Sequence, residues 1–85
     1  MIVIFKKAFW KKYEKLPLKI KDRFDERLIL FTKNPHNPIL KVHPLKGTMA
    51  EFRSFSVTGS YRAIFKMIDL ETIKLIDIGK HGQIY

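Results

Sequence analysis

His43-Pro44-Leu45-Lys46-Gly47 is the stretch that decides the fold, because this proline-stiffened basic loop leads into three short strands. The strands are read in the segments Phe52-Arg53-Ser54-Phe55-Ser56-Val57, Tyr61-Arg62-Ala63-Ile64-Phe65-Lys66 and Ile73–His81, which are rich in aromatic and β-branched residues. This arrangement places two histidines and two arginines near the same sheet. The N-terminal half is then expected to cover the sheet.

The N-terminal half reads as one strand followed by two helices. Ile2–Phe5 is a short β-branched apolar run typical of a buried strand. A first amphipathic helix is predicted over residues 7–15, where apolar side chains recur at helical spacing among lysines. Pro17 cannot continue a helix interior but suits the first turn of a new helix, so a second helix is predicted over residues 17–32. The apolar positions of that second helix are Ile20, Phe24, Leu28 and Phe31.

The chain after the helices is dense in turn formers. Asn34-Pro35-His36-Asn37-Pro38 stops the second helix, and residues 39–45 are expected to run extended. Residues 58–60 and 69–72 are predicted to form hairpin turns. The predicted fold class is therefore α+β, in the order β-α-α-β-β-β, with two helices packed on a small, curved, mainly antiparallel sheet. Residues 1–85 are expected to form a single domain.

Side chains of the predicted strand at 61–68 alternate between the two faces of the sheet. One set is Tyr61, Ala63, Phe65 and Met67. The other set, which is expected to be exposed, is Arg62, Ile64, Lys66 and Ile68. Arg53 shares its parity with Phe55 and Val57 on the preceding strand, so both arginines are expected to emerge from regular structure.

The composition is strongly basic and contains no cysteine. Seventeen Lys and Arg residues stand against 8 Asp and Glu, a formal net charge of +9. A field this positive favours encounter with nucleic acid or with an acidic protein, although solubility alone is the alternative reading. The absence of cysteine excludes disulfides and thiolate zinc sites. No apolar stretch reaches the roughly 18 residues that cross a bilayer, so a soluble cytoplasmic protein is expected.

The loop and the strands together resemble the RelE/ParE superfamily of bacterial toxins. The motifs that carry the resemblance are Lys-Val-His-Pro-Leu-Lys-Gly at 41–47, Phe-Arg-Ser-Phe-Ser-Val at 52–57, Tyr-Arg-Ala-Ile-Phe-Lys at 61–66, Asp-Ile-Gly-Lys-His at 77–81, and Tyr85. The resemblance is nearest to the RelE-like mRNA interferases, including the YafQ and YoeB branches, and spans essentially the whole chain.

The resemblance implies a sheet with a concave basic face for RNA. It implies a toxin of a type II toxin-antitoxin system that cleaves mRNA in the ribosomal A site, without a metal or another cofactor, and so inhibits translation. The implied partners are mRNA, the ribosomal RNA of the 70S ribosome, and an antitoxin whose acidic or amphipathic segment wraps the toxin and blocks or distorts the site.

Metal-free RNA cleavage needs a base for the 2′-hydroxyl, cations for the scissile phosphate and an acid for the leaving 5′-oxygen. Histidine suits either proton transfer, and arginine can donate two parallel hydrogen bonds to phosphate. By resemblance, His43 is the candidate general base and His81 is the candidate general acid. The sequence alone does not determine which histidine has which role. Taken alone, each histidine reads more readily as a surface residue that stabilises a loop or caps a chain end.

The remaining site residues are also assigned by resemblance. Arg62 is expected at the scissile phosphate, and Arg53 at a substrate phosphate or at the charge of the transition state. Tyr85 is expected to stack on a nucleobase or to assist proton transfer, or else to be frayed and idle. The lysines expected to bind substrate are Lys46, Lys66 and Lys80. The acidic residues that would instead hold the arginines in ion pairs are Glu51, Asp69 and Asp77.

The chain departs from the YafQ branch at one place, and two other functions stay open. Ser56 and Ser60-Tyr61 stand where that branch carries a further histidine and an Asp-Trp pair. A ParE-like toxin of the same fold inhibits DNA gyrase by protein contact and needs no paired proton-transfer groups. The other alternative is a non-catalytic basic RNA-binding protein. No His-x-x-x-His spacing or carboxylate cluster indicates a metal site.

Overall fold

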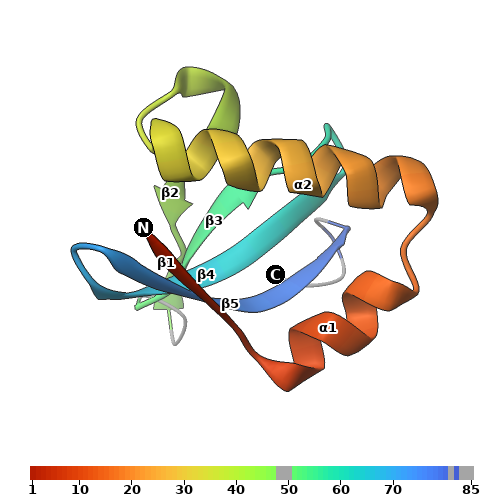
Figure 1. The fold of residues 1–85 in the computed structure, drawn as a ribbon, viewed down its shortest axis with the longest axis horizontal. Helices are drawn as coiled ribbons and strands as arrows, with labels where there is room; N and C mark the ends of the chain where they lie inside the picture. Colours follow the sequence, from red (N-terminus) through yellow and green to blue (C-terminus); the bar gives the residue numbers. More distant parts are fainter. Residues whose placement is uncertain (48–50, 81, 83–85) are drawn as a thin grey trace.

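The computed structural model describes residues 1–47, 51–80 and 82 (Figure 1). In chain order the elements are β1 (Ile2–Phe5), α1 (Lys7–Glu14), α2 (Leu18–Lys33), the 3-10 turn η1 (Pro38–Leu40), β2 (His43–Pro44), β3 (Arg53–Ser56), β4 (Tyr61–Asp69) and β5 (Thr72–Lys80). The predicted α+β class and element order are confirmed, with the two-residue strand β2 added ahead of β3. No helix of the described residues is long and apolar enough to cross a membrane.

The five strands form one sheet in the order β1-β5-β4-β3-β2. Three of the four neighbouring pairs are antiparallel, whereas β1 runs parallel to β5. The antiparallel pair β4–β5 contains two register shifts, one beside Ile64 and one beside Met67. Such bulges increase the local twist of a sheet. The sheet is therefore mixed but mainly antiparallel, as predicted.

Both helices lie against one face of this sheet, with α2 crossing it and α1 beside β5 (Figure 1). The contact is made largely of phenylalanine rings. Phe31 of α2 lies 5.0 Å from Phe65 and 5.5 Å from Phe55, measured between ring centroids, and Phe24 lies 6.1 Å from Phe55. Phe9 of α1 is fully buried in the same cluster. The helical spacing of apolar residues in the sequence thus identifies the face that each helix buries.

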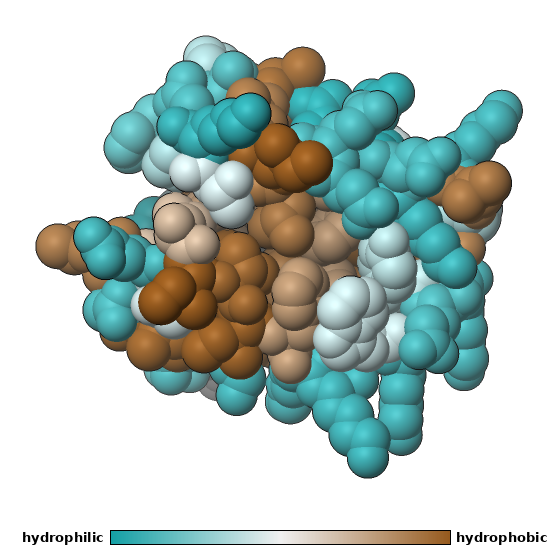
Figure 2. Space-filling view, in the orientation of Figure 1, coloured by the Kyte–Doolittle hydropathy of each residue, from teal (hydrophilic) through white to brown (hydrophobic). Residues whose placement is uncertain are grey.

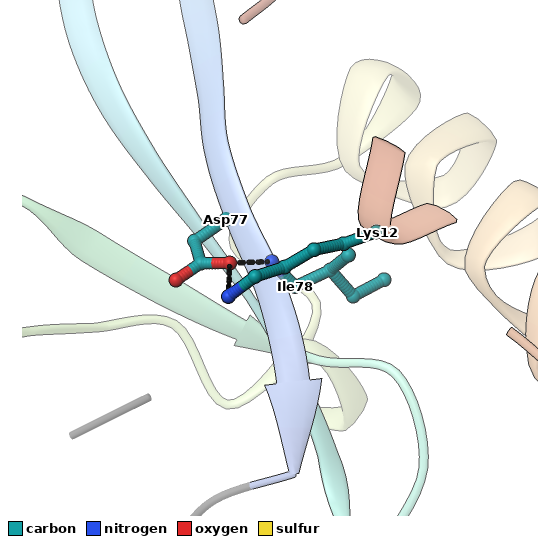
Figure 3. Close-up of polar contacts among 3 residues, drawn as sticks. All are labelled: Lys12, Asp77 and Ile78. Atoms are coloured by element: carbon teal, nitrogen blue, oxygen red, sulfur yellow. Dashed lines mark hydrogen bonds and ion pairs between the residues drawn. The ribbon is translucent and has the colours of Figure 1, made fainter. Parts of the chain in front are cut away.

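Two polar contacts fix the position of α1. Lys12 places its Nζ 2.7 Å from Oδ1 of Asp77 on β5, and the same oxygen accepts a hydrogen bond from the backbone N–H of Ile78 (Figure 3). The hydroxyl of Tyr13 donates to Oδ1 of Asp25 on α2 at 2.9 Å. Burial and this hydrogen bond raise the pKa of Tyr13 to about 12. Because the phenol donates to a carboxylate, its neutral form is the one that the fold stabilises.

The segment between α2 and the sheet differs from the prediction. Residues 39–45 were expected to be extended, but Asn37 accepts a hydrogen bond from the N–H of Ile39 and caps the 3-10 turn η1. Lys41 then adopts a left-handed conformation, with φ 48° and ψ 44°, which reverses the chain. Only His43 and Pro44 join the sheet. The prediction was wrong here because a side-chain cap competes with extended backbone at an Asn-Pro pair.

Ile64 also differs from its predicted exposure. It points away from the helices, as the parity of β4 predicts, yet it is fully buried. Ile64 lies at the bulge opposite residues 75–77 of β5, where the register shifts. A bulge coils the sheet locally. The alternation of side chains along β4 therefore identifies the face on which Ile64 lies but not its exposure.

Candidate functional site

One face of the sheet carries no helix among the described residues, and the strand register identifies its side chains. Ser54 of β3 pairs with His43 on one side and with Ile64 on the other, so these three form a row across the sheet. Arg62 pairs with Ser56 in the next row on the same face. We call this surface, defined by His43, Ser54, Ser56, Arg62 and Lys66, the open face.

His43 is exposed at the edge of the open face, in the strand β2. Its Nδ1 lies 3.1 Å from the carbonyl oxygen of Lys41. A carbonyl only accepts, so Nδ1 carries the proton and the neutral ring has its lone pair on Nε2. The left-handed turn at Lys41 directs this carbonyl back toward the ring. The local backbone thus selects the tautomer that a general base requires.

Arg62 is half-buried on β4. Its Nη1 is buried and has no hydrogen-bond partner within the part of the chain that the structure describes. With strands about 4.8 Å apart and residues about 3.3 Å apart along a strand, the register places the Cα atoms of His43 and Arg62 about 12 Å apart. The two side chains therefore share one face of the sheet, two strands and two residues apart.

Ser54 is a polar residue of this face that the sequence reading missed. It is fully buried, and its Oγ has no partner among the described residues. It lies directly between His43 and Ile64 in the row that crosses the sheet. The alternation of side chains along this strand was the signal that could have identified Ser54, because Ser54 is next to the core residue Phe55 and so points to the opposite face. A hydroxyl buried without a partner leaves its capacity to donate and accept hydrogen bonds unused.

Arg53 and Lys80 do not lie with Arg62. Arg53 pairs with Phe65, whose side chain is in the helix-covered core, so Arg53 points to the helix side of the sheet. Lys80 pairs with Tyr61, and its Nζ lies 6.0 Å from the Tyr61 ring centroid. Strand alternation therefore places Arg53 and Arg62 on opposite faces of the sheet, and the role expected for Arg53 at a substrate phosphate or at the charge of the transition state stays a prediction.

The other predicted residues are placed as follows. Lys66 shares the open face with Arg62, and its Nζ lies 3.7 Å from Oε2 of Glu51. Lys46 is exposed after β2. His81 and Tyr85 lie outside the described residues.

The predicted alternative, in which acidic residues hold the arginines, is not observed among the described residues. Glu51 pairs with Lys66, and Asp77 pairs with Lys12. Asp69 accepts a hydrogen bond from the N–H of Glu71. Over the same described residues, no group of three or more His, Cys, Asp or Glu side chains is arranged to hold a metal ion.

The family model of the ParE toxin of the type II toxin-antitoxin system parDE matches residues 3–85. This chain belongs to the ParE toxin family. The resemblance to the RelE/ParE superfamily inferred from the sequence is thereby confirmed, and the protein is a toxin of a type II toxin-antitoxin system. No curated protein matches the sequence at a significant level.

Solved structures share the fold of this ParE-family toxin. YafQ from E. coli strain BL21(DE3) superposes with a TM-score of 0.81 at 18% identity, covering 98% of this chain and 96% of that one. The YoeB/ParE toxin from Agrobacterium tumefaciens gives a TM-score of 0.76 at 21% identity, over 95% and 99% of the two chains. A chain of the YoeB-YefM complex from Staphylococcus aureus gives 0.75 at 19% identity, over 95% and 97%. At these identities the likeness establishes the fold.

Proposed function

We propose that this toxin is a ribosome-dependent endoribonuclease that cleaves mRNA in the A site and so inhibits translation. The observation that supports it best is the pairing of groups on the open face. The contact of His43 Nδ1 with the carbonyl oxygen of Lys41 leaves Nε2 as the lone-pair nitrogen of the neutral ring. Arg62, on the same face, holds a buried guanidinium nitrogen without a partner among the described residues. A base and a phosphate-binding cation are two of the three groups that metal-free cleavage needs.

In the proposed reaction, Nε2 of His43 accepts the proton of the 2′-hydroxyl. The 2′-oxygen attacks phosphorus, and the bond from phosphorus to the 5′-oxygen breaks, which leaves a 2′,3′-cyclic phosphate. Arg62 binds the phosphate oxygens that gain negative charge. His81 protonates the leaving 5′-oxygen. It follows Gly79 by two residues in the sequence, and Gly79 is the strand partner of Arg62.

Binding of mRNA and ribosomal RNA is supported by the net charge of +9. Lys46 and Lys66 are proposed to contact backbone phosphates, and Tyr85 to stack on a base. The pair that Lys66 makes with Glu51 is solvent-exposed and weak, so a phosphate can replace it. An antitoxin is the proposed protein partner, which is consistent with the YoeB-YefM complex and with the RelBE2 complex from Mycobacterium tuberculosis among the similar structures.

Inhibition of DNA gyrase is a second candidate function, because the matching family model describes ParE toxins. A toxin of that kind acts by protein contact and does not need His43 or Arg62 as reacting groups. Supercoiling assays with purified gyrase test this function directly.

The decisive experiment is primer extension on a reporter mRNA in a purified translation system, with and without ribosomes. The parent toxin should give ribosome-dependent cuts at fixed codon positions, and His43→Gln should abolish them. His36→Gln is the matched control, because His36 is exposed in the turn before η1 and is not on the open face. Intact mRNA together with inhibited supercoiling would instead establish the gyrase function.

A further inference from the structure

A groove on the helix side of the sheet lies on the opposite side from His43 and Arg62. Its volume is about 600 Å³. It lies between the C-terminal end of α2, the segment 35–42, and the ends of β1 and β4. The apolar residues lining it include Met1, Phe31, Val42, Phe65, Met67 and Leu70. Figure 2 shows this face, where apolar surface gathers between α2 and the N-terminal strand and is bordered by hydrophilic residues.

The polar lining of the groove is basic. His36, Lys41 and Arg53 border it, and no Asp or Glu is among the described residues that line it. Arg53 is exposed and makes no ion pair with any described acidic residue. A guanidinium at the wall of an apolar groove favours a carboxylate, which it can bind through two parallel hydrogen bonds. The groove therefore has both an apolar surface and an anion-binding group.

The apolar surface also continues out of the groove. Leu70, at the tip of the β4–β5 hairpin, is 93% exposed, and Met1 is 46% exposed. Large exposed apolar side chains at the rim of an apolar groove are typical of a protein interaction site. A small anion would leave this rim uncovered, whereas a peptide segment with apolar side chains on both sides of a carboxylate would cover it.

We propose that this groove docks a segment of the antitoxin that carries an Asp or Glu side chain between apolar residues, with the carboxylate bound to Arg53. The proposal rests on the toxin-antitoxin part of the proposed function and is independent of the nuclease reaction. The groove and the open face lie on opposite sides of the sheet, so a segment seated here does not cover His43 or Arg62. Docking in the groove thus anchors the antitoxin without itself occluding the open face.

Titration of the purified toxin with the antitoxin encoded beside it tests the groove, with dissociation constants measured by calorimetry. Arg53→Ala and Leu70→Asp should each weaken binding by at least about 30-fold, the loss that defines a residue dominating an interface. Two exposed residues of α2 provide matched controls. Arg23→Ala removes an equal charge, and Leu18→Asp changes another exposed leucine, so both should bind within about threefold of the parent.

Growth assays separate this proposal from the nuclease proposal. Leu70→Asp should remain toxic but should no longer be neutralised by the antitoxin, because Leu70 is exposed and outside the open face. Parent-like affinity of both groove variants, with thermal midpoints unchanged, would overturn the docking site. Loss of antitoxin binding in Lys66→Ala with no loss in Arg53→Ala would also overturn it, by placing the interface on the open face. If the toxin cuts no mRNA, the nuclease proposal fails, but the binding measurements still test the docking site.

Discussion

Replacing Arg62 by methionine should stabilise the folded toxin while abolishing cleavage. Methionine keeps an unbranched apolar stem and removes the guanidinium. The buried Nη1 of Arg62 lacks a partner in the described chain, and a buried donor left unpaired costs about 1–3 kcal/mol. The side chain is only half-buried, so the lower end of that range applies, and the expected gain is about 1 kcal/mol of unfolding free energy.

This gain corresponds to a rise in Tm of about 4–8 °C for a domain of this size. The same substitution should reduce mRNA cleavage by at least about 100-fold, the usual loss when a preorganised donor to the developing negative charge is removed. Differential scanning calorimetry gives the first quantity, and primer extension in the translation system gives the second.

Arg27 provides the matched control, since its Nη1 is also buried without a partner among the described residues but lies on α2. Arg27→Met should raise Tm by a similar amount and leave cleavage unchanged. A fall in Tm for Arg62→Met would show that its guanidinium is satisfied in the fold. Parent-like cleavage by this variant would refute the assignment of Arg62 to the phosphate.

The remaining predictions concern stability. Tyr13→Phe should cost about 1 kcal/mol in urea unfolding, because it removes the hydrogen bond to Asp25. The pKa of Tyr13 is raised to about 12 in the folded protein, from about 10 in the unfolded chain. The contribution of Tyr13 to the unfolding free energy is therefore complete below pH 10 and is lost as the pH rises through 12. Across that range the parent should lose more stability than the variant. Asp77→Ala should cost about 1 kcal/mol by the same measurement, because it removes the acceptor for Lys12; no loss would show that the contact contributes nothing. Ser54→Ala should not lower Tm in differential scanning calorimetry, because its buried Oγ has no described partner; a lower Tm would show that the hydroxyl is hydrogen-bonded in the fold.

The helices and the order of elements along the chain could be predicted from the sequence, because apolar spacing reports directly on burial. The predicted helix ends lie within one residue of those observed for α1 and α2. The conformation of the segment before β2 could not be predicted from the sequence. It depends on a cap by Asn37 and on the left-handed backbone of Lys41, and neither leaves a periodic pattern in the sequence. The burial of Ile64 depends on a bulge in the partner strand, and alternation within one strand cannot report that.

The candidate site was only partly predictable. The resemblance identified His43 and Arg62, which the register then places on one face. It also grouped Arg53 with them, although its parity with Phe55 already indicated the opposite face, since Phe55 is a core residue. The tautomer of His43 required the position of one carbonyl oxygen, which only the folded backbone supplies.

The parallel pairing of β1 with β5 has a consequence for the synthesis of the toxin. Ile2 pairs with Thr72, which the ribosome adds 70 residues later, and β1 has no other strand partner in the sheet. At about 5–20 residues per second, the first strand waits roughly 4–14 s for the last one to be made. The sheet cannot close until translation of the chain is nearly finished, so β1 keeps its backbone N–H and C=O groups unpaired, and open to other chains, for most of the synthesis.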